Sequence, residues 1–365
     1  MTMTTIKDNN LFDVYKMYFK HGDFNDFSNV KRNHILSSLI REIKIINAKK
    51  DSISEKEIES IYDILVKLSV MARIDLIMAM KGIKSKDISF IGGIKRSKDV
   101  IDYALKIIVK LLYKLDEEQI TSHYTNKFID NDSISHTSRV FIITVRFMKY
   151  YNNSINNNIV SDIRKKFKKR YSNYYKNVLR KFNISKKITR LEHVYKNGLR
   201  DILFNELVNI AISAFWHDIS NLSNNYNKDY NTSKCYSYLK HFVKYNYDIS
   251  LTVGLHNEYY GYGNGVFLNY YNTIINSNTL FAPNYIISFD YNDTLKLNSV
   301  SYFPSKVLEI IDLFDRITYS NNSSVNNDDA LAFISDNYLD KEVKVDPIIF
   351  DIFSSFVSDN IKLIA

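Results

Sequence analysis

The sequence is poor in the residues that disulfide-bonded, turn-rich and membrane-spanning proteins need. Its 365 residues include one cysteine, three prolines and nine glycines. The single cysteine, Cys235, excludes an internal disulfide and is typical of a reducing compartment. So few prolines and glycines disfavour a turn-rich β protein. No apolar run reaches the roughly 18 residues of a membrane helix, and the first residues lack the apolar segment of a signal peptide. We therefore expect a soluble, cytoplasmic, helical protein.

What the sequence does contain is an apolar and basic composition. Apolar residues make up 45% of the chain, which is enough to build a globular core. The formal net charge is +9. A positive balance favours an anionic partner, such as a nucleotide, nucleic acid or an acidic membrane surface, without choosing among them. The length suits about two domains.

Hydrophobic periodicity predicts helices throughout the chain. A capping-box pattern over residues 54–57 precedes apolar residues that recur at helical spacing. Gly92-Gly93 interrupts this pattern, which resumes over residues 100–115. A further helix is expected to begin near His136, and the asparagine-rich residues 152–158 are expected to form a loop. The predicted fold class is all-α.

The motifs divide the predicted helices into two domains. Residues 1–125 contain no metal or nucleotide motif and are predicted to be a helical domain that could sense a signal or dimerise; the sequence leaves a homodimer open. The second domain is expected over residues 126–365, with a basic helical insertion at about 151–198.

The insertion carries a strongly basic segment that has two interpretations. Cations over residues 164–170 are followed by Tyr171, Tyr174 and Tyr175. Cations next to aromatic rings can bind phosphates and bases, which is typical of nucleic-acid binding. The favoured interpretation is a solvated helix face whose lysine stems cover apolar surface. Nucleic acid is therefore not an expected partner.

The strongest chemical motif is the dipeptide His217-Asp218, which follows an apolar helical run. An imidazole and a carboxylate presented at one point suit divalent metals, above all two ions that share the carboxylate. The dipeptide alone is weak evidence for a metal site, but other residues of metal-ligating types occur before and after it along the chain. These candidate ligands are His136, His217, Asp218, His241, His256 and Asp312.

At these residues the chain resembles the HD-GYP family, the metal-dependent cyclic-di-GMP phosphodiesterases of the HD superfamily. Residues 136–140, His-Thr-Ser-Arg-Val, resemble the family's His-x-x-Arg-Val. His217-Asp218 resembles His-Asp-x-Gly-Lys, and His241 matches a lone histidine. Residues 256–265, His-Asn-Glu with a glycine-rich loop, are similar to His-His-Glu and the loop that names the family. Residues 312–315 are similar to its last motif. The resemblance covers about residues 130–365.

The resemblance implies a helical HD-type bundle that linearises cyclic di-GMP to pGpG, and that could continue to GMP. His136, His217, Asp218, His241, His256 and Asp312 would hold two divalent ions, with Fe or Mn favoured. Asp218 would bridge them, and His217 and Asp218 would be the catalytic pair. The ions would activate a shared hydroxide for in-line attack.

The substrate phosphates need further groups. Arg139, Lys244 and Arg316 are the candidate phosphate cations. Gly261 and Gly263 could let the backbone approach the substrate.

Three departures from the family pattern keep other functions open. Asn221 stands in place of the lysine, Asn257 replaces the second histidine, and the Tyr-Pro of the loop is missing. These losses motivate a catalytically degenerate module that binds nucleotide or a protein partner. A different HD hydrolase, acting on a nucleotide such as ppGpp or a dNTP, is a further alternative, and a nucleic-acid binder is the last.

Overall fold

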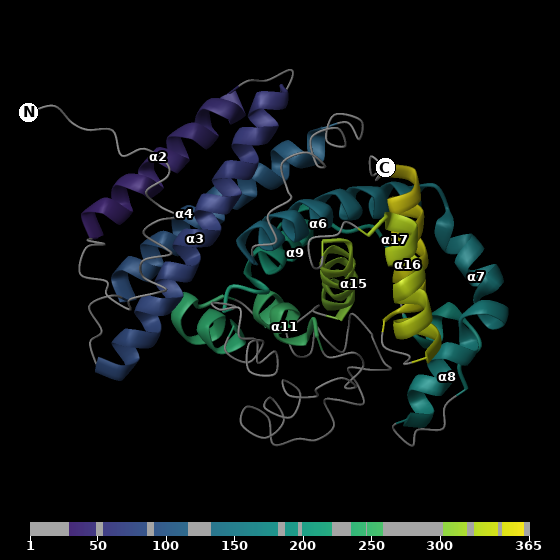
Figure 1. Cartoon of the computed structure of the whole chain (residues 1–365). Coiled ribbons are helices and arrows are strands. Elements are labelled where there is room, and N and C mark those ends of the chain that lie inside the picture. Colours follow the sequence, from purple (N-terminus) through teal and green to yellow (C-terminus); the bar gives the residue numbers. More distant parts are fainter. Residues whose placement is uncertain are drawn as a thin grey trace, which may run out of the picture.

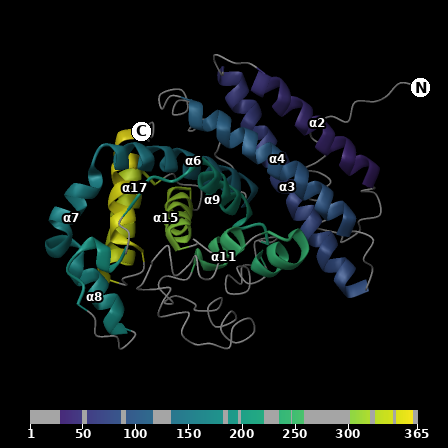
Figure 2. The same cartoon turned by 180° about the vertical axis from the view of Figure 1, so that it is seen from behind.

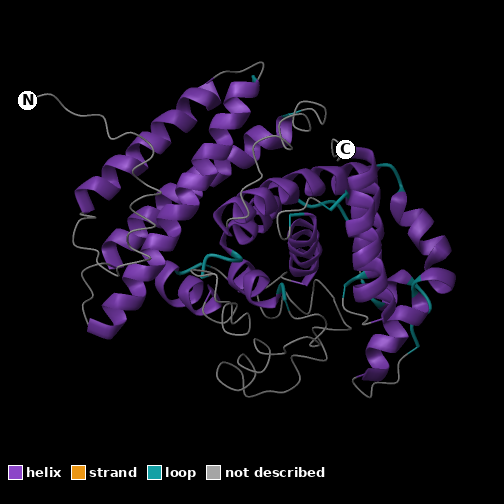
Figure 3. Ribbon diagram, in the orientation of Figure 1, coloured by secondary structure: helices purple, strands orange, loops and turns teal. Residues whose placement is uncertain are grey.

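The computed structural model describes most of the chain. The described residues are 29–48, 54–85, 91–115, 133–181, 187–195, 199–220, 235–245, 247–257, 302–319, 325–341 and 345–360. Within these ranges every regular element is a helix and no strand occurs (Figure 3). The predicted all-α fold is therefore confirmed. No helix in these ranges combines the length and apolar character that crossing a membrane requires.

Three long helices near the N-terminus form one layer of the molecule (Figure 1). They are α2 (Asn29–Ala48), α3 (Glu55–Ser85) and α4 (Ile91–Lys114). The capping-box pattern marks the start of α3, where the Ser54 backbone N–H donates to Glu57 Oε2 at 2.6 Å. The Gly92-Gly93 pair lies inside the first turn of α4, so the expected interruption at these glycines is wrong, and the helix already begins at Ile91.

The middle of the molecule is built around α6 (Ser133–Asn156). This helix packs against α9 (Phe204–Trp216) and α15 (Tyr302–Thr318), and α11 (Tyr247–Leu255) contacts both of those helices. On its other side α6 contacts α3 and α4 of the N-terminal layer, and Figure 2 shows this layer from behind. The helix α6 therefore lies between the N-terminal layer and the helices that complete the candidate site.

The remaining helices flank α6 and α15 at the far end of the molecule (Figure 1). This group comprises α7 (Ile159–Arg170), α8 (Ser172–Lys181), η1 (Leu191–His193), α16 (Asn327–Ile334), η5 (Ser335–Lys341) and α17 (Pro347–Asn360). The short π-helix η2 (Leu239–Val243) lies beside α4 and α11.

Buried apolar side chains form a continuous core across both halves of the chain. A single cluster extends from Leu39 in α2 to Val357 in α17. The predicted division at residue 125 lies outside the described residues. On either side of that segment, α4 and α6 pack directly against each other, so the N-terminal helices share their core with the rest of the protein.

The loop predicted at residues 152–158 is wrong for its first part, because α6 continues to Asn156. A tertiary contact explains the difference. The Asn152 side chain donates to the Ile202 carbonyl at 2.9 Å and accepts the Ile202 N–H at 2.7 Å. Asparagine disfavours helix interiors in isolation, but these buried bonds outweigh that weak preference. The turn is confined to residues 157–158, where Asn158 has a φ of 64°.

The basic segment over residues 164–175 exposes its cations and buries most of its aromatic rings. Phe167, Tyr171 and Tyr175 belong to the core, and the Tyr175 hydroxyl donates to Asp346 at 2.9 Å. Arg164 and Arg170 are exposed and pair with acidic side chains. Buried rings cannot stack on bases, so this arrangement agrees with the solvated helix face favoured from the sequence.

Candidate metal centre

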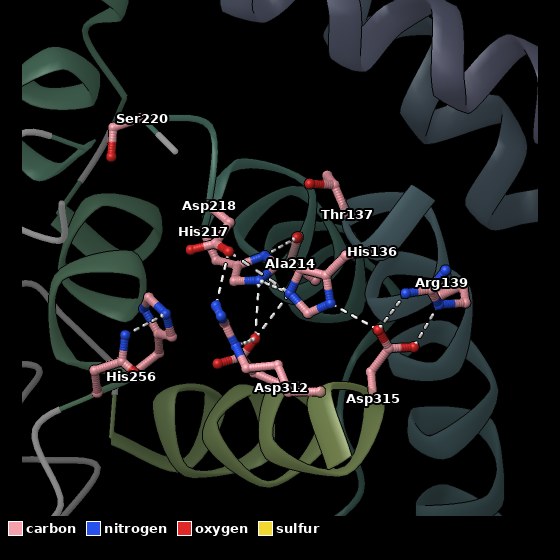
Figure 4. A network of polar contacts seen from close by, with 12 residues as sticks. His136, Thr137, Arg139, Ala214, His217, Asp218, Ser220, His256, Asp312 and Asp315 are labelled. Atoms are coloured by element: carbon pink, nitrogen blue, oxygen red, sulfur yellow. Dashed lines mark hydrogen bonds and ion pairs between the residues drawn. The ribbon is translucent and has the colours of Figure 1, made fainter. Parts of the chain in front are cut away.

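Four of the sequence-predicted ligands converge in the interior (Figure 4). His136 lies in the first turns of α6, His217 and Asp218 lie in the turn after α9, and Asp312 lies on α15. All four are buried, and one ligand atom from each lies within 4.8 Å of the others. Residues 176 positions apart in the chain therefore meet at one point because α6 packs against both α9 and α15.

The local sequence explains why the His-Asp pair points inward. The helix α9 buries most of its side chains and ends at Trp216, inside the core. The following turn keeps His217 1% and Asp218 4% exposed. Two buried polar side chains in such a place require polar or ionic partners, because an unpaired carboxylate would be costly to bury.

Hydrogen bonds fix the orientation of both histidine rings. The Nδ1 of His217 lies 2.7 Å from the Ala214 carbonyl, which can only accept, so this Nδ1 carries the proton. The Nδ1 of His136 donates in the same way to Asp315 Oδ2 at 2.7 Å. The two Nε2 atoms consequently face each other at 3.1 Å. This is the orientation that metal-binding histidines adopt when their other nitrogen is bonded to a carbonyl or carboxylate.

The two aspartates bring negative charge to the same point. Asp312 Oδ1 lies 2.9 Å from His136 Nε2 and 3.3 Å from His217 Nε2, and Asp218 Oδ2 lies 3.7 Å from His136 Nε2. Burial raises the pKa of the Asp312 carboxyl, but Arg316 and the histidines lower it more, so its pKa lies well below the usual range. Burial also opposes a charge on His136, yet its bonds to Asp312 and Asp315 raise its pKa. The group thus attracts a cation.

Asp315 supports His136 from behind and is itself held by an arginine. Arg139 donates from Nε to Asp315 Oδ1 at 2.8 Å and from Nη2 to Oδ2 at 2.9 Å. The Arg139 guanidinium stacks on the Tyr319 ring at 4.2 Å. Burial raises the pKa of Asp315, but Arg139 and His136 lower it by more, so its pKa lies below the usual value. The carboxylate therefore stays ionised and keeps the proton on His136 Nδ1.

The other two predicted histidine ligands lie outside this group. His241 is exposed on η2, so the structure does not bring it to the buried ligands. His256 is buried at the end of α11, with its ring 5.3 Å from that of His217. Its Nδ1 donates to the Val253 carbonyl at 2.6 Å, and its Nε2 accepts from the Asn257 amide at 3.0 Å. Burial and the neighbouring His217 lower the pKa of His256 to about 4, so it is a neutral side chain.

The predicted substrate-binding residues differ in where the structure places them. Arg139 is 2% exposed and bonded to Asp315, so it supports the site from within and does not face a substrate. Lys244 is exposed after η2, with a φ of 59°. Gly261 and Gly263 lie outside the described residues. Arg316 alone of these residues touches the ligand carboxylates among the described contacts, with bonds to Asp218 and Asp312.

Sequence reasoning missed one residue that touches the site from the N-terminal layer. Arg73 of α3 is fully buried, and its Nη2 donates to the Asp218 carbonyl at 3.4 Å and to Thr137 Oγ1 at 3.2 Å. Arg73 therefore contacts the backbone of one candidate ligand, Asp218, and the residue that follows another, His136. The available signal was a single arginine in an otherwise apolar helical stretch, Val70-Met71-Ala72-Arg73-Ile74.

Arg73→Met is expected to weaken metal binding by about tenfold or more, the range seen when a residue behind a metal ligand is lost. Asp218 lies in a turn beyond α9, where helical bonds do not hold the backbone, so Arg73 contributes to placing its carboxylate. Titration of Mn²⁺ into metal-stripped protein measures the affinity. Arg41→Met, at an exposed position of α2, is the control for loss of charge. Equal affinities of the two variants would contradict this role.

The donor set has the chemistry of a divalent metal site. Imidazole nitrogens and carboxylate oxygens together suit Mn, Fe and Zn. Comparisons with family models, curated proteins and solved structures find no match to this chain. The buried group of His136, His217, Asp218 and Asp312 could hold a metal ion.

Proposed function

We propose that this chain is a metal-dependent phosphohydrolase and that its substrate is cyclic di-GMP, which it opens to linear pGpG. The observation that carries the proposal is the buried group of two histidines and two aspartates, with ligand atoms within 4.8 Å of one another. Support for the substrate comes from the order of His136, His217-Asp218 and Asp312 along the chain, which resembles the HD-GYP pattern.

The residues have separate tasks in this proposal. His136 and His217 would hold the ion through their Nε2 atoms, and Asp218 and Asp312 would hold it through carboxylate oxygens. A divalent metal, when bound, supplies the Lewis-acid chemistry of phosphoester hydrolysis. Asp315 keeps the proton on His136 Nδ1. Burial of all four ligands excludes bulk water and strengthens their attraction for a cation. We propose Fe or Mn as the metal, in two copies if His256 also contributes.

The test is turnover of cyclic di-GMP by protein that was purified without oxygen and loaded with Fe²⁺ or Mn²⁺. Wild-type protein is expected to release pGpG, whereas His217→Ala is expected to release none, because the variant lacks a ligand from the buried group. His193→Ala is the matched control, since His193 lies in η1 and bonds to its own neighbours instead of the site. A metal-loaded wild type that leaves cyclic di-GMP intact would exclude this substrate.

The second candidate function is a binding module that has lost catalysis. It is favoured by one specific contact, the Asn257 amide on His256 Nε2, which uses the lone pair that a second metal would need. The metal content of the purified protein separates the two candidates, since the proposed hydrolase needs its metal for activity, whereas a module that has lost catalysis does not. A protein that binds cyclic di-GMP with no metal and no turnover would support the module.

A further inference from the structure

Arg316 is the charged side chain that links the buried ligands to the surface. Its Nε donates to Asp312 Oδ1 at 2.8 Å, one helical turn earlier on α15, and its Nη2 donates to Asp218 Oδ2 at 2.7 Å. The Arg316 side chain is 27% exposed, whereas those of Asp218 and Asp312 are 6% and 2% exposed. The guanidinium therefore reaches from the edge of the site to the innermost carboxylates.

The guanidinium bonds to the same oxygens that the histidine nitrogens approach. Asp312 Oδ1, which accepts from Arg316, also lies 2.9 Å from His136 Nε2. Asp218 Oδ2, the other acceptor, is the oxygen that lies 3.7 Å from His136 Nε2. An ion held by these nitrogens would draw on the same carboxylate oxygens. The metal and the guanidinium are thus two cations with overlapping partners.

The net charge of the buried group changes when a metal ion binds. Asp218 and Asp312 together contribute a charge of −2, which Arg316 reduces to −1. One divalent ion with two neutral histidines would balance both carboxylates. The positive charge of Arg316 would then be in excess, next to the metal and partly exposed. The Asp315–Arg139 pair is neutral as a unit, and Arg73 at the Asp218 carbonyl adds a further positive charge to the surroundings of the group, with or without a metal.

We propose that Arg316 is an exchangeable counter-cation. It holds Asp218 and Asp312 in the metal-free protein, and on metal binding its guanidinium is released to bind an anionic oxygen of the substrate. Planar guanidinium groups bind phosphate oxygens with the same pair of donors that they use for carboxylates. This inference rests on the metal site of the proposed function and adds the substrate class, a phosphate-bearing anion, and the residue that binds it.

The first experiment is calorimetric titration of Mn²⁺ into the metal-stripped, full-length protein. Arg316→Gln is expected to bind Mn²⁺ on the order of tenfold more tightly than the wild type, because a competing cation is gone; couplings of this kind are typically 5–150-fold. Arg316→Lys keeps the charge and is expected to remain close to the wild type. Arg200→Gln removes an arginine that pairs with Glu206 away from the ligands, and it should leave the affinity unchanged.

The second experiment measures binding of inorganic phosphate to the Mn²⁺-loaded proteins. Arg316→Gln is expected to bind phosphate about tenfold more weakly, whereas Arg316→Lys retains most of the affinity. Weaker Mn²⁺ binding by Arg316→Gln would overturn the proposal, since it would make Arg316 a support for the ligands. Unchanged phosphate binding would overturn it as well. Both readouts are independent of cyclic di-GMP turnover by the wild type, so the inference and the proposed substrate can fail separately.

Discussion

Asp218→Asn is expected to weaken Mn²⁺ binding by more than about a hundredfold and to abolish the proposed hydrolysis. Loss of a residue behind a ligand already costs roughly 10- to 100-fold in metal affinity, and Asp218 is a direct ligand of the proposed ion. The change keeps the size of the side chain but removes half of the carboxylate charge of the group. It also removes the ion pair between Arg316 and Asp218. Titration of Mn²⁺ and turnover of cyclic di-GMP are the two measurements.

The matched control for this change is Asp201→Asn. Asp201 is exposed just before α9, so the substitution alters the net charge by the same amount at a distance from the ligands. Thermal unfolding in the absence of metal shows whether either variant is misfolded. If Asp218→Asn binds Mn²⁺ as tightly as Asp201→Asn does, Asp218 is not a metal ligand. The proposed function would then be contradicted at its central residue.

The four converging candidate ligands were selected by their residue types and by the resemblance to the HD-GYP pattern, whereas helical periodicity predicted only that they lie on helices or at helix ends. His136 lies near the start of α6, Asp312 lies on α15, and His217-Asp218 follows the apolar run that forms α9. Convergence itself required helix packing, which single-sequence patterns do not contain. For that reason His241 could not be separated from the other histidines in advance, although the structure leaves it exposed.

Long-range contacts explain the remaining differences between sequence and structure. The role of Arg73 depends on the packing of α3 against α6, which brings a residue of the N-terminal layer to the Asp218 carbonyl. Arg139 was expected to face a phosphate, but Asp315 lies across from it and accepts from its Nε and Nη2. A cation in a sequence motif can serve a substrate or a buried carboxylate, and only the position of its partner distinguishes these roles.

Asp315→Asn is expected to lower both stability and metal affinity, by separate mechanisms. It leaves the buried guanidinium of Arg139 without its carboxylate, a loss that typically destabilises a protein by about 3–5 kcal/mol. It also replaces the charged acceptor of the His136 Nδ1 proton by a neutral amide oxygen, which accepts more weakly, so the ring is held less firmly with Nε2 toward the other candidate ligands. The second effect is expected to weaken Mn²⁺ binding by roughly 10- to 100-fold. Denaturant unfolding of the metal-free protein and Mn²⁺ titration measure the two effects.

The double variant Asp315→Asn/Arg139→Met separates these mechanisms. Methionine removes the buried charge that has lost its carboxylate and fills much of the space beside Tyr319, so stability should recover in large part. The metal affinity should stay low, because His136 still lacks a carboxylate at Nδ1. Recovery of both properties together would mean that Asp315 acts only by neutralising Arg139. Recovery of stability alone would identify Asp315 as the residue that positions His136, a task that depends on its lying three residues after the ligand Asp312 on α15.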